Sequence, residues 1–334
     1  MSFIEEIKKQ ARKDIKTIVL PETEDIRILE ATQMILEEGF ANIILVGDSE
    51  KINNLATDNN INLEGAQIVN PATFSGFSKY ANDLYELRKA KGMTLDQAKE
   101  LLMNNSRYFA TMMVKEGDAD GFVSGAANPT SDTLRPALQI LKTAPGTKLV
   151  SAFFVMVLPN NQYGENGVFI FSDCGLNEYP DSDALSEIAI SSAASFKELI
   201  GKEPKVAMLS YSTHGSARSP LTDKVVEATK LLKQKAPDLI CDGEIQLDAA
   251  IIPEIAERKA PDSPLKGEAN ILIFPDLDAG NIGYKLTQRL GNAEAYGPLC
   301  QGISKAVNDL SRGCSSKDIA GVVAITAVQA QNMK

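Results

Sequence analysis

Short runs of apolar, often β-branched residues alternate along this chain with longer stretches in which apolar residues recur at helical spacing. Residues 17–20 form the first such run, and a helical pattern that ends near Gly39 follows it. Alternation of this kind is typical of βαβ units. The pattern therefore predicts an α/β fold with a mainly parallel sheet.

The same pattern predicts elements along the rest of the chain. Further strands are expected at residues 43–46, 66–69, 121–123, 149–158, 168–171, 206–210 and 270–274. Further helices are expected at residues 75–90, 95–115, 131–142, 182–200, 223–234, 279–290 and 315–331. Because turn-forming residues separate 149–158 from 168–171, these two strands are predicted to form a hairpin that interrupts the parallel order.

Length indicates more than one domain. The chain has 334 residues, and about 150 residues per domain is a common size. The strongest boundary signals are the pairs Pro145-Gly146 and Gly297-Pro298. We therefore expect two domains.

Composition and charge exclude several classes of protein. The formal net charge is −10, which argues against a nucleic-acid or membrane-surface partner because both are anionic. The strongly apolar run 152–158 is far shorter than the roughly 18 residues of a spanning helix. The N-terminus lacks the apolar segment of an export signal, and the four cysteines form no C-x-x-C pair. We expect reduced thiols in a cytoplasmic protein.

Several common catalytic motifs are absent. The chain has no G-x-G-x-x-G after a strand, no G-x-x-x-x-G-K-[ST] and no G-x-S-x-G. Its one histidine, His214, lies in a polar loop and is interpreted as a loop residue hydrogen-bonded to backbone. No metal site is expected, since the ligands would have to come from scattered cysteines and carboxylates.

Arginines in loops carry the positive evidence. Arg135 follows a loop of small residues that leaves one strand and enters a helix, where unpaired backbone N–H groups and a guanidinium could hold an anion. In Ser311-Arg312-Gly313-Cys314 and the nearby Asp318, a hydroxyl, a guanidinium, a thiol and a carboxylate surround a glycine. The sequence pattern supports a two-domain α/β enzyme that binds a phosphorylated small molecule.

Each of these residues also has a structural interpretation. Arg88 ends a predicted helix, where a cation stabilises the helix dipole. Asp318 and Ser315 have the spacing of a capping box. Cys314 could be a small residue in a tight turn.

Four segments, at residues 84–94, 120–140, 274–291 and 308–319, resemble the phosphate acetyl/butyryltransferase family and its acetyl enzymes in particular. The resemblance implies reversible acetyl transfer between acetyl phosphate and coenzyme A, by direct attack of the thiolate in a ternary complex. Coenzyme A would be a co-substrate, with no tightly bound cofactor. It also implies a homodimer with a fold like isocitrate and isopropylmalate dehydrogenases, in which two α/β domains, 1–146 with 298–334 and 147–297, flank the active-site cleft.

The resemblance also implies roles for individual residues. Arg88, Arg135 and Arg312 would hold the phosphoryl group, Ser311 would hydrogen-bond near the reacting carbonyl, and Asp318 would be the general base. Further substrate-binding positions are expected at Arg27, Arg289, Ser124, Gly125 and Thr130.

Other functions stay open at this point. They are butyryl-type acyl transfer, a nicotinamide-dependent dehydrogenase of related fold, and a non-catalytic protein that binds a phosphorylated metabolite. A second route for the transferase would pass through an acetyl-thioester on Cys314.

Overall fold

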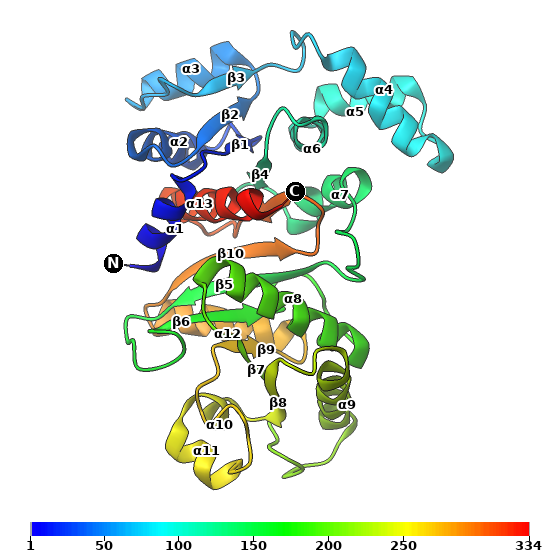
Figure 1. Cartoon of the computed structure of the whole chain (residues 1–334). Coiled ribbons are helices and arrows are strands. Elements are labelled where there is room, and N and C mark those ends of the chain that lie inside the picture. Colours follow the sequence, from blue (N-terminus) through cyan, green and yellow to red (C-terminus); the bar gives the residue numbers. More distant parts are fainter. Residues whose placement is uncertain (1, 334) are drawn as a thin grey trace. The chain divides into compact units, whose positions relative to one another are not determined.

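The computed structural model describes residues 2–333 and divides them into two compact units (Figure 1). Unit 1 extends to Pro145 and resumes at Ile303, and unit 2 is Gly146–Gly302. The first boundary coincides with the Pro145-Gly146 pair. The second boundary follows Gly302 and not the expected Gly297-Pro298 pair. That pair lies inside a strand, at a point where the pairing register shifts.

Unit 1 contains a parallel sheet with the strand order β3-β2-β1-β4-β11. Its strands are β1 (Thr17–Leu20), β2 (Asn42–Val46), β3 (Gln67–Val69), β4 (Gly121–Ser124) and β11 (Ala306–Asp309). Every residue of β4 and β11 is buried. Strands covered on both faces are expected in a parallel sheet of this kind.

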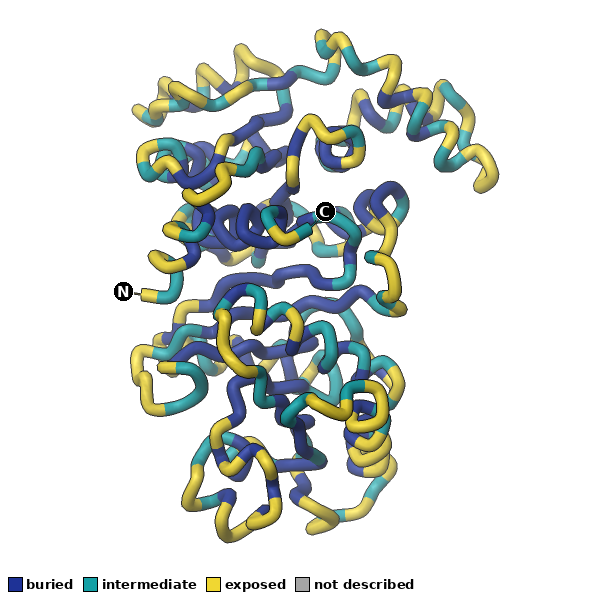
Figure 2. The backbone as a smooth tube through the Cα atoms, in the orientation of Figure 1, coloured by how far each residue is buried: buried dark blue, intermediate teal, exposed yellow. Residues whose placement is uncertain are grey.

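The helices of unit 1 are α1 (Phe3–Ala11), α2 (Ile26–Glu38), α3 (Ser49–Asp58), α4 (Phe77–Arg88), the 3₁₀ turn η1 (Lys89–Lys91), α5 (Leu95–Asn104), α6 (Ser106–Glu116), α7 (Thr130–Ile140) and α13 (Ser316–Asn332). Of these, α2, α6, α7 and α13 contact strands of the sheet. Helix α13 contacts β4, β11, α1 and α2, and it is buried from Ile319 to Ala330 (Figure 2). Helices α6 and α7 contact each other, α6 against β4 and α7 against β11.

Unit 2 contains a mixed sheet with the strand order β10-β5-β6-β9-β7-β8. Its strands are β5 (Ser151–Val157), β6 (Val168–Ser172), β7 (Lys205–Leu209), β8 (Ile240–Ile245), β9 (Ile271–Ile273) and β10 (Glu294–Gln301). The β10/β5 and β5/β6 pairs are antiparallel, and the remaining pairs are parallel. The helices are α8 (Ser182–Ile200), α9 (Pro220–Lys235), α10 (Leu247–Ile251), α11 (Pro253–Lys259) and α12 (Leu277–Leu290).

The core of unit 2 forms around aromatic residues of β5, β6 and α12. Phe154 and Tyr284 stack with ring centroids 4.0 Å apart, and Phe169 contacts Phe171 edge to face. Leu272 of β9 belongs to the same buried cluster. The stack of Phe154 on Tyr284 thereby holds α12 against β5.

The predicted α/β class and the β5–β6 hairpin are confirmed. The single helix predicted at 95–115 is wrong. Asn105 leaves the helical conformation, and its side chain accepts hydrogen bonds from the N–H groups of Arg107 and Tyr108, so it begins a second helix. In residues 2–333 no helix combines the length and the apolar character needed to cross a membrane.

Candidate active site

Three loops of unit 1 meet at one edge of its sheet. They follow β1, β4 and β11, which are adjacent and parallel, with Asp309 of β11 aligned with Ser124 of β4. Loops at the carboxyl ends of neighbouring parallel strands are the usual place for a binding site. Most of the predicted site residues lie in these loops or in the helices that follow them.

Arg27, in the first turn of α2, joins the three loops. Its Nε and Nη2 atoms donate to the two carboxylate oxygens of Asp25, at 3.0 and 2.6 Å. Its Nη2 atom also donates to the carbonyl of Ala126 at 2.8 Å, and its Nη1 atom to the carbonyls of Arg312 and Cys314 at 3.0 and 2.8 Å. The guanidinium is thus engaged with protein groups, and its predicted contact with substrate stays a prediction.

The loop after β4 binds an internal carboxylate. Glu22, with 0% of its surface exposed, accepts the N–H groups of Gly125 and Ala126 at 2.7 and 2.8 Å and the side-chain amide of Asn128 at 2.6 Å. Arg107 lies 3.9 Å from the same carboxylate. The expectation that the N–H groups of Gly125 and Ala126 are free for an anion is therefore wrong, because Glu22 already occupies them.

The N-terminus of α7 remains available next to this loop. It begins after Pro129, and no side chain caps it, so N–H groups of its first turn lack intrahelical partners. Arg135 lies in the second turn of the helix and is exposed. These are elements of an anion site, although they come from the helix and not from the loop.

Arg88 and Arg135 face a common group. Burial raises the pKa of the Tyr108 hydroxyl, and the positive charges of Arg135 and Arg88 oppose that rise. Both guanidinium groups therefore lie within electrostatic range of one buried side chain. The ion pairs of the described residues engage Arg12, Arg27 and Arg107 among the arginines, but none engages Arg88, Arg135 or Arg312.

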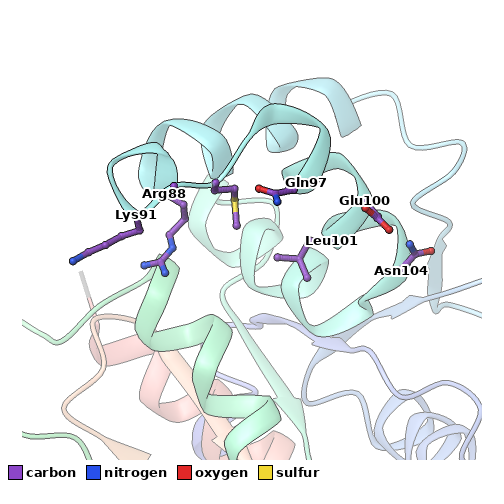
Figure 3. A pocket seen from close by; sticks show the side chains of 8 residues that line it. Arg88, Lys91, Gln97, Glu100, Leu101 and Asn104 are labelled. Carbon is purple, nitrogen blue, oxygen red and sulfur yellow. The ribbon is translucent and has the colours of Figure 1, made fainter.

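A pocket of about 530 Å³ lies beside Arg88. Figure 3 shows Arg88 and Lys91 toward one end of it and Glu100 and Asn104 toward the other, with Leu101 of α5 between them. The Nε atom of Arg88 is buried without a hydrogen-bond partner in the described chain. Arg88 does end α4, as its interpretation as a capping cation requires, and its Nε donor is not used by that role.

Residues 311–318 form a turn and the start of α13. The Cys314 N–H donates to the Ser311 carbonyl at 2.9 Å. Ser315 and Asp318 form the predicted capping box, in which Asp318 Oδ2 accepts from the Ser315 N–H and hydroxyl at 2.8 and 2.9 Å. Both bonds use Oδ2, and no donor among residues 2–333 bonds Oδ1 of Asp318, which can accept a proton.

Three residues that the sequence analysis missed lie behind these loops: Glu22, Arg107 and Asp309. Arg107 is 15% exposed on its side chain, and its Nε atom has no partner among residues 2–333. Glu22 lies two residues after β1, and Asp309 is the last residue of β11. That position, a carboxylate at the carboxyl end of a parallel strand, is the signal that could have found them.

Comparison with known proteins decides the family. The model of the phosphate acetyl/butaryl transferase family matches residues 2–327. The chain belongs to this family. A phosphate acetyltransferase from Acetivibrio thermocellus is 60% identical over 334 residues, which is 100% of both chains. A crystal structure of a phosphotransacetylase from Streptococcus pyogenes has a TM-score of 0.91 at 43% identity, over 99% of this chain and 100% of that one.

The fold of this acyltransferase extends to more distant proteins. A Salmonella typhimurium protein described as a 4-hydroxythreonine-4-phosphate dehydrogenase has a TM-score of 0.50 at 14% identity, over 94% of this chain and 99% of that one. That likeness concerns the fold alone. It agrees with the expected resemblance of the transferase family to dehydrogenases.

Cys314 is poorly suited to carry an acyl group in this transferase. Burial raises the pKa of its thiol to about 11, although the charge of Arg27 opposes the rise. At neutral pH such a thiol is ionised in roughly one molecule in ten thousand, and the thiolate is the nucleophile. All four cysteines are buried thiols.

Two predicted features of the transferase lie in unit 2. Arg289 is an exposed residue at the end of α12, and its predicted role near substrate stays a prediction. His214 is a loop residue hydrogen-bonded to backbone, as interpreted, because its N–H donates to the Glu244 carbonyl at 3.1 Å; its ring Nε2 atom lies 3.0 Å from Oδ2 of Asp242. Within residues 2–333 no cluster of His, Cys, Asp or Glu could hold a metal ion.

Proposed function

We propose that this chain catalyses reversible transfer of acetyl between acetyl phosphate and coenzyme A. Its family and the phosphate acetyltransferases that it resembles support this proposal. The observation that carries it is the set of guanidinium groups in unit 1 that form no ion pair among the described residues. The charges of Arg88 and Arg135 both act on the pKa of the Tyr108 hydroxyl. Arg312 lies in the loop after β11, and β11 pairs with β4, whose own loop leads into α7.

These arginines would bind the phosphoryl group. At about 4 Å and an effective dielectric constant near 20, each guanidinium attracts a phosphate charge by roughly 4 kcal/mol before desolvation. Exposed charges elsewhere are screened beyond roughly 8 Å, so the net charge of −10 does not prevent binding. The same groups would neutralise the oxygens that gain charge as phosphate leaves.

Asp318 and Ser311 would act on the thiol and the carbonyl. The free Oδ1 atom of Asp318 accepts the thiol proton, and the thiolate attacks the acetyl carbon. The bond from that carbon to the phosphate oxygen then breaks, and inorganic phosphate leaves. The Ser311 hydroxyl, which accepts only a long 3.4 Å contact from the Gly313 N–H, can donate to the carbonyl oxygen as charge develops there.

The remaining parts of the proposal concern partners and location. Coenzyme A is a co-substrate and no other cofactor is tightly bound. The enzyme acts as a homodimer in the cytoplasm. The four cysteines are thiols, which supports a reducing compartment, and an exposed apolar face on α12 offers a surface for a second copy.

A single assay tests the activity. The purified protein is mixed with acetyl phosphate and coenzyme A, and thioester absorbance is followed without nicotinamide. We expect many turnovers per protein chain. A signal that stops at one equivalent would indicate a non-catalytic metabolite-binding protein, and faster turnover with butyryl phosphate would indicate the butyryl type of enzyme.

A further inference from the structure

Asp309, at the end of β11, is a buried carboxyl group with incomplete hydrogen bonding. None of its surface is exposed. The Thr130 hydroxyl lies 2.6 Å from its Oδ2 atom, while its Oδ1 atom forms no hydrogen bond of ordinary geometry within the described chain. Ser124 and Thr133, both fully buried, also have hydroxyl groups that form no hydrogen bond of ordinary geometry among residues 2–333.

The backbone packs tightly against this carboxyl group. Gly125 has a φ of +112°, and a Cβ atom there would lie 2.1 Å from Oδ1 of Asp309. Only glycine fits at this position. Asp309 is therefore enclosed by the loop after β4 on one side and by the first two turns of α7 on the other.

Thr130 connects Asp309 with the proposed anion site. It is the first residue of α7, whose N-terminus has no side-chain cap, and Arg135 lies on the same helix. A hydroxyl has a single hydrogen. If Asp309 is ionised, that hydrogen must point at Asp309. If Asp309 is protonated on Oδ2, Asp309 donates to the Thr130 oxygen, and the hydroxyl hydrogen is free to point elsewhere.

We propose that Asp309 is a positioning residue that holds a proton and, through Thr130, directs a hydroxyl hydrogen toward the bound phosphoryl group. This inference rests on the proposed function. No bond to substrate is made by Asp309 itself. Ionisation of Asp309 would remove the donor and add a negative charge behind the phosphoryl group.

Burial favours the protonated form of Asp309. Burial raises the pKa of Asp309 to about 7, the hydroxyls of Thr130 and Thr133 and the N–H of Leu310 oppose the rise, and the charge of Glu22 adds to it. Glu22 differs from Asp309 in its donors, since its carboxylate accepts three N–H groups.

Other elements that pack against β11 bring little charge to Asp309. The contacts of α13 with Asn308 come from the uncharged Thr326 and Gln329. The charged residues in the first two turns of α7 and the first turn of α13 form no ion pair or hydrogen bond with Asp309 in the described structure; they are Asp132, Arg135, Lys317 and Asp318.

Sulfate is the probe for this inference, since it is a dianion that does not titrate between pH 6 and pH 9. Its inhibition constant against acetyl phosphate is measured across that range for the unmodified protein and for Asp309→Asn, Thr130→Val and Thr130→Ser. At each pH, the inhibition constant of the unmodified protein is divided by that of Asp309→Asn. We expect this ratio to rise at least fivefold between pH 6 and pH 8.5. The amide mimics the protonated carboxyl, so the comparison cancels all other titrations.

The threonine variants provide an independent readout if Asp309→Asn does not fold. Thr130→Val should bind sulfate more weakly at pH 6 and should lose the pH dependence, whereas Thr130→Ser should keep both. A constant ratio between the unmodified protein and Asp309→Asn, or a Thr130→Val variant with the full pH dependence, overturns the inference. The proposed function fails differently, since the unmodified protein would then form no acetyl-CoA at any pH.

Discussion

Asp318 has a structural partner and a free oxygen at the same time. A capping box alone explains why a carboxylate follows Ser315 by three residues, and its two bonds to Ser315 both involve Oδ2. A proton acceptor needs one lone pair aimed away from the helix. Oδ1 provides it, so the two roles are compatible in one side chain.

Replacing Asp318 with Asn separates these roles. The amide can still cap α13 but cannot accept a proton, so kcat should fall by about 10²–10⁴-fold, the usual contribution of a general base. Ser315→Ala is the matched control, which should lose about 1 kcal/mol of unfolding free energy and keep most of kcat. Initial rates and urea denaturation measure the two effects. Near-normal turnover by Asp318→Asn would contradict the base role.

Arg312 should respond to a change that keeps its charge. Arg312→Lys replaces a planar fork with a point charge, which cannot bind two phosphate oxygens at once. We expect kcat to fall by more than KM for acetyl phosphate rises, because the lost contacts strengthen as phosphate leaves. Arg258→Lys on α11 is the control and should change neither value. A large rise in KM at constant kcat would assign Arg312 to ground-state binding only.

Cys314 tests the direct route. Because burial holds the pKa of its thiol at about 11, it should carry no acetyl group. Cys314→Ala should therefore keep kcat within about threefold. Incubation with radiolabelled acetyl phosphate, without coenzyme A, should leave no label on the unmodified protein. Stable labelling that Cys314→Ala abolishes would establish the thioester route instead.

At the scale of elements, strands that are apolar throughout were predictable and polar strands were not. The run Thr17–Leu20 is β1 residue for residue. The strands β8, β10 and β11 were missed because each includes polar or turn-forming residues, such as Asp242, Pro298 and Asn308. Their position in the sheet, and not their own composition, makes them strands.

The candidate site divides in the same way. Ser311, Arg312 and Asp318 are close in sequence and could be found as one motif, whereas Glu22 and Asp309 become neighbours of the loop after β4 only through the strand order. A contact between residues 103 positions apart, such as Glu22 to Gly125, leaves no pattern in a single sequence. The position of Glu22 after β1 could have marked it as a candidate, but its contact with the loop after β4 was not predictable.

Arg27 should contribute more to the free energy of unfolding than an arginine of an exposed ion pair does, because it bonds all three loops of the site. Arg27→Met keeps the length of the side chain but leaves the Asp25 carboxylate and three loop carbonyls without their donor. We expect a loss of roughly 2–5 kcal/mol in unfolding free energy, as when a partly buried ion pair loses one member. Urea denaturation measures it. Arg12→Met, at an exposed ion pair, should cost less than about 1 kcal/mol, and equal losses would contradict the role of Arg27.

At the scale of the whole molecule, most of the predicted site residues and the most exposed leucine and isoleucine side chains occur in different units. Nearly all predicted site residues belong to unit 1, and Arg289 belongs to unit 2. On α12 of unit 2, Ile282, Leu286 and Leu290 are 57%, 52% and 79% exposed. Their spacing of four residues puts them on one face of the helix. An apolar stripe of this kind is typical of a protein interface.

The proposed homodimer therefore has a direct test on α12. The double change Leu286→Lys and Leu290→Lys places two charges on the stripe, where a symmetric interface would bring them close to the same charges of the second copy. Sedimentation at micromolar concentration should show a dimer for the unmodified protein and a monomer for this variant. Leu247→Lys, which changes an exposed leucine of α10 outside the stripe, should remain dimeric. Because burying each Lys side chain without a counter-charge costs several kcal/mol, a variant that stays dimeric would mean that α12 lies outside the interface.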